Sequence, residues 1–292
     1  MRFPLYWFFL LAHIASLLFG LMGLLIVLPN TEFIESLSPL GMQIFAFGMQ
    51  SGGAVYMIFG AIAAFLYGKQ QLGLKRTLAF MLPAIFLSLG SELLGTSTGF
   101  PFGAYSYLSG LGYKILDLVP FTIPLSWFYM GFVSFLLAGT TLTANSHWLH
   151  RLEAIALGAM MLTAWDFVLD PAMSQAQYPF WEWHQFGAFF GMPLQNFAGW
   201  MATGALFMTV ASVLWGAKGH PLLNRNQLAF PLVVYVGNFM FGALLSIGAG
   251  IYPPIPLGLL LGIAPAVGLW WRSPQSKKPE TTPTPQPVVA NS

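Results

Sequence analysis

The sequence predicts an all-α polytopic membrane protein, a helical bundle of about eight transmembrane helices. Hydrophobic residues make up 57% of the 292 residues, charged residues only 7%, and the mean hydropathy is +0.70. Uncharged apolar runs recur along the chain, and each is long enough for a helix to cross a hydrocarbon core of about 30 Å. A water-soluble domain of this composition would expose large apolar patches, so we assign the chain to a membrane.

The expected spans follow one another from the N-terminus to a polar tail. They occupy residues 5–28, 41–67, 77–94, 120–143, 151–169, 195–215, 228–249 and 255–271. The first run follows Arg2, is longer than a signal-peptide core and is not followed by a small-x-small cleavage site, so we expect it to be retained. An integral membrane domain is therefore expected over residues 1–272. The tail, residues 273–292, is rich in Pro, Thr and Gln and is expected to be disordered, cytoplasmic and unnecessary for chemistry.

Basic residues predict the orientation, because cytoplasmic loops retain Lys and Arg. With eight spans, ten of the eleven basic residues fall on one side: Arg2, Lys69, Lys75, Arg76, Arg151, Lys218, Arg225, Arg272, Lys277 and Lys278. Only Lys114 falls on the other. We therefore expect a multi-pass protein with both termini cytoplasmic, in the cytoplasmic (inner) or a thylakoid membrane.

The sequence also excludes several classes of chemistry. It contains no cysteine, which excludes disulfides, thiolate metal sites and a cysteine nucleophile. The net charge of +2 is mostly the cytoplasmic rim, so nothing favours nucleic-acid binding.

Four of the nine acidic residues lie at or near membrane depth. Glu92 falls near the outer end of the third span, in "SLGSELLGTSTGFPFGAYSY". Asp166 and Asp170 end the fifth span in "WDFVLDPAM", and Glu182 leads into the sixth in "YPFWEW". The alternation of spans places all four on the face poor in positive charge. Ionisable residues in a membrane are costly and by default mark a site, so we expect catalytic residues on this face.

Asp166 and Asp170 are one helical turn apart, about 6 Å along the axis, and point to nearly the same side. Two close carboxylates in a low dielectric resist double ionisation, so one can keep its proton near neutral pH and act as a general acid. A structural role is the alternative. Because Asp170 precedes Pro171, where helices tend to end, it would order that terminus while Asp166 bonds a neighbouring helix.

Aromatic side chains and a few polar ones accompany the acids. The candidate substrate-binding residues are Trp165, Tyr105, Tyr107, Trp181, Trp183, Asn196, His184 and Phe102. Aromatic faces beside a carboxylic acid suit a reaction that passes through a carbocation, and they suit a long apolar substrate. Membrane anchoring is the alternative for the aromatics, a hydrogen-bonded surface position for His184, and an N-cap of the sixth helix for Asn196. Interleaved glycines, such as Gly95 and Gly103, allow loops to fold back over a cavity.

Several motifs carry a family resemblance. The fragments "ELLGTSTGFPFGAYSY", "VPFTIPLSW", "WDFVLDPAM", "FWEW" and "FFGMPLQNFAGW" resemble the membrane-bound carotenoid 1,2-hydratases of the CruF type, γ-carotene 1′-hydroxylase and bisanhydrobacterioruberin hydratase-like proteins. The resemblance covers residues 82–200 with specific motifs. It implies addition of water to the terminal C=C of an acyclic ψ-end, with no redox cofactor and no metal. γ-Carotene is the first expected substrate and lycopene the next, and the implied partners include other enzymes of carotenoid biosynthesis, such as a glycosyltransferase.

The resemblance and the residues together give a mechanistic hypothesis. Asp166 or Asp170 protonates C2 of the terminal isopropylidene group, aromatic faces hold the tertiary cation at C1, and water attacks with Glu92 or the other aspartate as base.

Three rival functions remain open. A membrane prenyltransferase would use D-x-x-x-D to hold Mg²⁺ on a diphosphate, although a second acidic motif and basic residues are missing. A transporter or proton channel would spread its acids across membrane depth. A carotenoid cyclase would protonate the same end group but exclude water.

Overall fold

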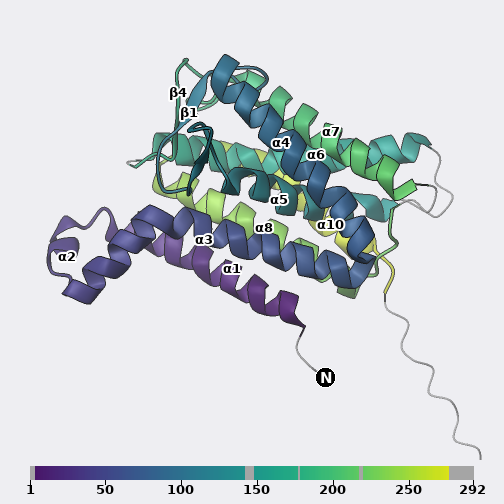
Figure 1. Ribbon diagram of the computed structural model, residues 1–292, viewed down its shortest axis with the longest axis horizontal. Coiled ribbons are helices and arrows are strands. Elements are labelled where there is room, and N and C mark those ends of the chain that lie inside the picture. Colours follow the sequence, from purple (N-terminus) through teal and green to yellow (C-terminus); the bar gives the residue numbers. More distant parts are fainter. Residues whose placement is uncertain (1–3, 142–147, 177, 217–219, 276–292) are drawn as a thin grey trace, which may run out of the picture.

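The computed structural model describes residues 4–141, 148–176, 178–216 and 220–275. These residues form one bundle of long helices with a small cap of strands at one end (Figure 1). The tail expected to be disordered lies almost wholly outside the described residues.

Each of the eight expected spans corresponds to a helical segment. The segments are α1 (Leu5–Met22) continued by η1 (Gly23–Val27), α3 (Pro39–Leu72), α4 (Leu74–Thr98), α5 (Thr122–Ala138), α6 (Trp148–Gln175), α7 (Leu194–Trp215), α8 (Arg225–Gly248), and α9 (Pro254–Gly258) continued by η4 (Leu259–Ile263) and α10 (Ala264–Arg272). Among the described residues, 7 of them are long and apolar enough to cross a membrane, and α5 is a shorter apolar helix. The all-α fold of about eight membrane helices is confirmed, and the chain is an integral membrane protein.

Helix α5 lies at the centre of the bundle. Every residue of α5 except Leu125 is buried, and the helix packs against α3, α4, α6 and α8. A helix that is apolar on all sides needs partners on all sides. The side chains that α5 presents near its first turns, including Trp127, therefore face the protein interior and not lipid.

The start of the first described helix and the end of the last one lie at the end of the bundle opposite the strands. Figure 1 shows the start of α1 and the end of α10 at one end, while β1, β4 and the short α2 (Thr31–Glu35) lie at the other. An even number of crossings places the start of α1 and the end of α10 at the same end of the bundle. Which end faces the cytoplasm stays a prediction from the Lys and Arg pattern.

Helix α6 does not end before Pro171, contrary to the structural alternative considered for Asp170 from the sequence. It continues to Gln175, with Pro171 inside the helix and buried. Proline is tolerated within membrane helices because neighbouring segments satisfy the freed backbone groups, and α4 and α8 likewise contain Pro83 and Pro231. Asp170 therefore lies within the helix, with a further turn beyond it, and does not order a terminus.

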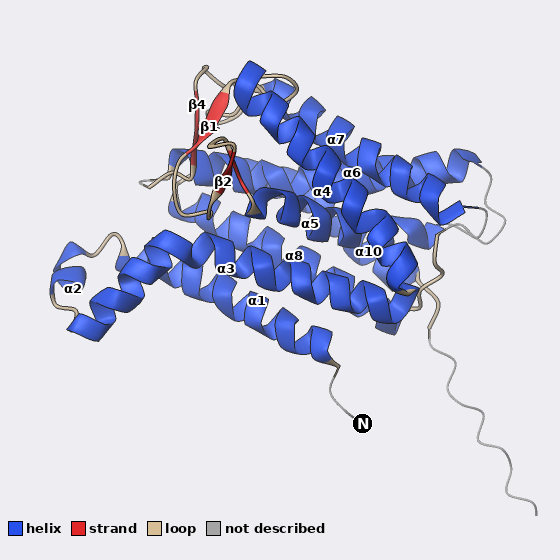
Figure 2. Cartoon of the chain, viewed as in Figure 1, coloured by secondary structure: helices blue, strands red, loops and turns tan. Residues whose placement is uncertain are grey.

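Two short antiparallel pairs form the cap over one end of the bundle, visible as red strands in Figure 2. Strand β1 (Tyr105–Tyr107) pairs with β4 (Trp181–Trp183), with Tyr105 opposite Trp183 and Tyr107 opposite Trp181. Strand β2 (Lys114–Ile115) pairs with β3 (Val119–Pro120). Because side chains alternate along a strand, these two tyrosines and two tryptophans face the helices together.

Candidate active site

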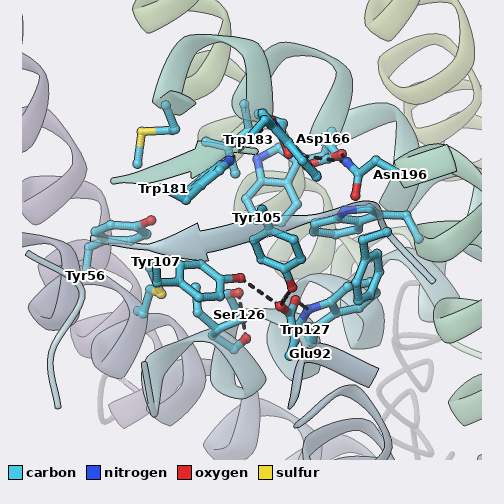
Figure 3. A pocket seen from close by; sticks show the side chains of 18 residues that line it. Tyr56, Glu92, Tyr105, Tyr107, Ser126, Trp127, Asp166, Trp181, Trp183 and Asn196 are labelled. Carbon is cyan, nitrogen blue, oxygen red and sulfur yellow. Dashed lines mark hydrogen bonds between the residues drawn. The ribbon is translucent and has the colours of Figure 1, made fainter. Parts of the chain in front are cut away.

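A small cavity lies under the strand cap, where the ends of α4 and α6 meet the starts of α5 and α7 (Figure 3). Its volume is about 50 Å³, enough for a few water molecules. The structure brings these sequence-predicted residues together around it: Glu92, Asp166, Asp170, Trp165, Tyr105, Tyr107, Trp181, Trp183, Asn196 and Phe102.

Glu92, buried near the end of α4, accepts hydrogen bonds from three donors. Its Oε1 accepts from the indole N–H of Trp127 at 2.9 Å. Its Oε2 accepts from the hydroxyl of Tyr107 at 2.9 Å and from the hydroxyl of Tyr105. A carboxylate that only accepts, and is surrounded by donors, is well matched to the ionised form.

Tyr105 and Tyr107 are buried in β1 and remain protonated donors. Burial, followed by the nearby negative charge of Glu92, raises the pKa of both phenols well above 10.0. The strand geometry explains why both reach the same carboxylate, since residues two apart in a strand share a face. Their O–H groups therefore stay available to Glu92 over the whole physiological pH range.

Asp170 is also held by several donors. Its Oδ1 accepts from the indole N–H groups of Trp183 at 2.9 Å and Trp181 at 3.3 Å, both from β4. Ser174 lies one turn further along α6, with its hydroxyl 3.5 Å from the same oxygen. The cap therefore binds both acidic helices, with β1 on Glu92 and β4 on Asp170.

Asp166 has a different environment. Its Oδ2 accepts from the side-chain amide of Asn196 at 2.8 Å, and the same amide nitrogen lies 3.3 Å from Oδ2 of Asp170. Its Oδ1 is buried and has no hydrogen-bond partner among the described residues. Asn196 lies within α7 and is buried, while Pro193 is the N-cap. Asn196 is thus not the cap of this helix, which was the alternative considered from the sequence.

Aromatic rings form most of the remaining wall. The rings of Trp127 and Trp200 stack with centroids 4.0 Å apart, and Trp165 meets Trp200 edge-on at 5.9 Å. Sequence reasoning did not select Trp127, Tyr56 or Ser126, which also line the cavity. The only sequence signal for Trp127 is its position at the end of "VPFTIPLSW".

Two glycines allow Phe102 to lie against the cavity. A Cβ on Gly95 would lie 2.7 Å from the Phe102 ring, and a Cβ on Gly199 would lie 2.4 Å from it. Neither position could carry a larger side chain without displacing the ring. The expected close approach of loop and helices is therefore present.

His184 lies outside the cavity, contrary to its selection as a substrate-binding residue. Its ring is about half exposed and 2.9 Å from the Ser106 hydroxyl, on the outer face of the strand pair. Glu182 lies on the same outer face, with its side chain 56% exposed. Alternation explains both positions: Trp181 and Trp183 point inward, and Glu182 and Ser106 point outward.

The three carboxyl groups of the site have no basic partner among the described residues. Within the described residues, no Lys or Arg lies within ion-pair distance of Glu92, Asp166 or Asp170. Nor does any group of three or more His, Cys, Asp or Glu side chains in that part of the chain have the geometry to hold a metal ion. Buried carboxylates without cationic partners, surrounded by aromatic faces, favour a positive charge that develops inside the cavity.

Fold and site together define an integral membrane protein with a buried carboxylate site closed by aromatic side chains. Residues 52–265 match the family described as carotenoid biosynthesis protein, and the chain belongs to that family. The matched region contains every residue of the acidic site. This confirms the family expected from the sequence motifs.

One curated relative is the bisanhydrobacterioruberin hydratase of Haloarcula japonica, which is 36% identical over 179 residues. The alignment covers 56% of this chain and 59% of the relative, so the chain spans about three fifths of that protein's length. No solved structure matches the chain.

Proposed function

We propose that the protein is a carotenoid 1′,2′-hydratase, a cofactor-independent hydro-lyase that adds water to the terminal C=C of an acyclic ψ-end. The observation that carries this proposal is the set of three buried carboxylates around one small aromatic cavity. Hydration needs a proton donor, a negatively charged and aromatic environment for the cation, and room for water. The family membership and the hydratase name of the relative support the same reaction.

Asp166 is the general acid in this proposal. Glu92 and Asp170 each accept hydrogen bonds from several donors, and these bonds favour their ionised forms over that of Asp166. The Oδ1 atom of Asp166 lacks a donor, so a proton on this oxygen costs no hydrogen bond. Two neighbouring anions also oppose a third negative charge on Asp166.

The reaction begins with proton transfer from Asp166 to the substrate. The Asp166 proton adds to C2 of the isopropylidene group, and the C1=C2 electron pair forms the new C–H bond. The resulting tertiary cation at C1 is stabilised by the Trp and Tyr faces and by the anions of Glu92 and Asp170. Water forms the C–O bond at C1, one of these carboxylates takes its proton, and that proton restores Asp166 for the next cycle.

A monocyclic γ-carotene is our first choice of substrate, followed by lycopene and related ψ-end carotenoids. The substrate reaches the site from the lipid bilayer, and water enters from the capped end of the bundle. Other carotenoid-biosynthesis enzymes, such as a glycosyltransferase that acts on the new hydroxyl group, are the proposed partners. Both termini are proposed to be cytoplasmic.

Expression in a host that accumulates γ-carotene or lycopene tests the proposal through mass analysis of the extracted pigments. A pigment heavier by one water supports hydration. An isomer of unchanged mass would instead identify a cyclase, and unchanged pigments with the protein present in the membrane would contradict the proposal.

The acid assignment has its own test. Asp166→Asn should lower the hydration rate by about 10²- to 10⁴-fold, the usual contribution of a general acid. The matched control is Glu182→Gln, which removes an exposed carboxylate at the same end of the bundle and should retain full activity. Full activity in Asp166→Asn, with normal protein level, would show that another group donates the proton.

A further inference from the structure

A second, larger cavity lies beside the acidic site. Its volume is about 440 Å³, within the range of about 300–1,000 Å³ typical of ligand pockets. Its walls come from α1, η1, α2, the first half of α3, the loop after β1 and the segment before β4, with one residue each from α6 and α8, Met173 and Phe241. Its polar surface is small, and several of the lining positions are glycines: Gly20, Gly23, Gly41, Gly48, Gly52, Gly53 and Gly110.

The two cavities share part of their lining. Tyr56 and Met173 line both the large cavity and the acidic one. The backbone of Tyr56 is held in place, because His13 in α1 is hydrogen-bonded through Nδ1 to the Tyr56 carbonyl oxygen at 2.7 Å. Met173, in contrast, has a flexible side chain that adapts its shape at little cost. The boundary between the cavities therefore has one side with an anchored backbone, at Tyr56, and one adaptable side, at Met173.

The shape of the large cavity fits an extended chain. Its lining on α3 runs from Gly41 to Tyr56, which at 1.5 Å per residue is about 22 Å. Glycines along this stretch flatten the wall, and no charged side chain lines the cavity. A long, straight and rigid hydrocarbon satisfies this geometry.

We infer that this cavity binds the polyene chain of the carotenoid substrate, with the ψ-end passing Tyr56 and Met173 to reach Asp166. The inference rests on the proposed hydratase function and adds the location of the rest of the substrate. A lipid acyl chain is the competing occupant, because it is also apolar. The continuity with a carboxylate-lined cavity favours the carotenoid, since an acyl chain has no group for those carboxylates to act on.

Two glycines allow a direct test. A Cβ on Gly23 in η1 or on Gly52 in α3 would meet no atom within 4 Å, so a large side chain there extends into open space and not into the protein. Gly268 in α10 is equally open but lies outside both cavities. Gly23→Trp and Gly52→Trp should therefore fill the cavity, and Gly268→Trp is the matched control for the same change in a membrane helix.

Binding is measured on the full-length Asp166→Asn protein, incubated with γ-carotene or lycopene, as visible absorbance of bound pigment per protein after detergent purification. We expect Gly23→Trp and Gly52→Trp each to reduce bound pigment about ten-fold or more. Gly268→Trp should bind as the parent does. Equal binding in all three variants would overturn the inference. Phospholipid that remains bound to the purified protein and is not displaced by the carotenoid would overturn it as well.

Turnover in the unmodified background separates this inference from the proposed function. Gly52→Trp should lower hydration of the long carotenoid about ten-fold or more but leave unchanged the hydration of a short acyclic isoprenoid with the same isopropylidene end. Equal loss with both substrates would place the defect at the acidic site and refute the cavity assignment. Pigment binding that depends on Gly23 and Gly52, with no hydrated product from the unsubstituted protein, would support the assignment of the cavity to the polyene chain and refute the proposed hydratase function.

Discussion

The side-chain amide of Asn196 donates a hydrogen bond of 2.8 Å to Oδ2 of Asp166, joining the start of α7 to the middle of α6. The same nitrogen lies 3.3 Å from Oδ2 of Asp170. One amide thus orients both aspartates of the pair, and leaves Oδ1 of Asp166 as the oxygen without a donor. Asn196 is a positioning residue in this arrangement.

Replacement of Asn196 by Leu should lower kcat with little change in KM. The variant loses the bond to protonated Asp166 and the longer one to ionised Asp170, and a hydrogen bond to a charged group contributes about 1.5–3 kcal/mol, which corresponds to roughly a 10- to 100-fold loss of rate. Steady-state kinetics on reconstituted protein measure this. The control is Gln195→Leu, which removes an exposed neighbour bonded to the Gly99 carbonyl. A raised KM with unchanged kcat would instead assign Asn196 to substrate binding.

Trp127→Phe should lower both activity and stability. The variant keeps an aromatic ring against Trp200 but removes the N–H that Glu92 accepts at 2.9 Å, so a buried carboxylate oxygen loses its donor. We expect a loss of about 1–3 kcal/mol in unfolding free energy, with reduced hydration.

Trp215→Phe is the matched control for that prediction. Trp215 is a buried tryptophan whose N–H donates to the Arg76 carbonyl oxygen at 2.9 Å, outside the acidic cavity. The Trp215→Phe variant should lose a similar amount of thermal stability in detergent and keep its activity per folded molecule. Equal activity losses in both variants would show that the Trp127 N–H has no specific role in the reaction.

The membrane spans and the convergence of the acids could be predicted from sequence, because both depend on local composition. An apolar run identifies a span wherever it lies, and the alternation of spans then places Glu92, Asp166 and Asp170 at one end. The contact between Trp127 and Glu92 could not be predicted in this way. In the sequence, a tryptophan inside an apolar helix cannot be distinguished from an ordinary packing residue. Its role becomes visible only when the hydrogen-bond partner, 35 positions away in the chain, is known.

The outward position of His184 could not be predicted from the sequence for a related reason. Strand β4 has three residues, too few for an alternating pattern to be recognised in the sequence. Without that pattern, inward Trp183 and outward His184 could not be distinguished. The structural alternative for Asp170 was wrong because the rule that helices end before a proline describes isolated backbone geometry, whereas a membrane helix continues through a proline when neighbouring segments satisfy its freed backbone groups.

Gly199→Ala should destabilise the protein. The added Cβ would lie 2.4 Å from the Phe102 ring and 3.0 Å from the Pro101 carbonyl oxygen, so the loop that covers the cavity must move. Overpacking of this kind costs about 1–3 kcal/mol. Thermal unfolding in detergent measures the change. Gly90→Ala, where an added Cβ meets nothing within 4 Å, is the control and should be neutral or stabilising; a stable Gly199→Ala would show that the loop packs loosely.

Acid should destabilise the protein through His220, in the segment before α8. Burial lowers the pKa of His220 from 6.5 to about 4, against the opposing effect of the carbonyl oxygens of Pro221 and Phe135. Between these pH values the unfolded chain binds a proton and the folded one does not, so stability falls as the pH falls from 6.5 to 4.

Melting temperatures between pH 7 and pH 4 test this prediction. His220→Gln cannot titrate, so its melting temperature should fall less steeply over this range than that of the unsubstituted protein. His150→Gln removes an exposed histidine and should leave the slope unchanged. Parallel curves for all three proteins would exclude His220 as the acid-sensitive group.

The orientation predicted from the basic residues can be tested with single cysteines, since the chain contains none of its own. Tyr113 is 74% exposed in the loop between β1 and β2, and Glu153 has a side chain 67% exposed near the start of α6, at the other end of the bundle. In intact cells, a membrane-impermeant thiol reagent should label Tyr113→Cys and not Glu153→Cys. Permeabilised cells should show labelling of both, which confirms that each cysteine is reactive. The reverse pattern in intact cells would place the acidic cavity at the cytoplasmic end and the termini outside, against the distribution of Lys and Arg.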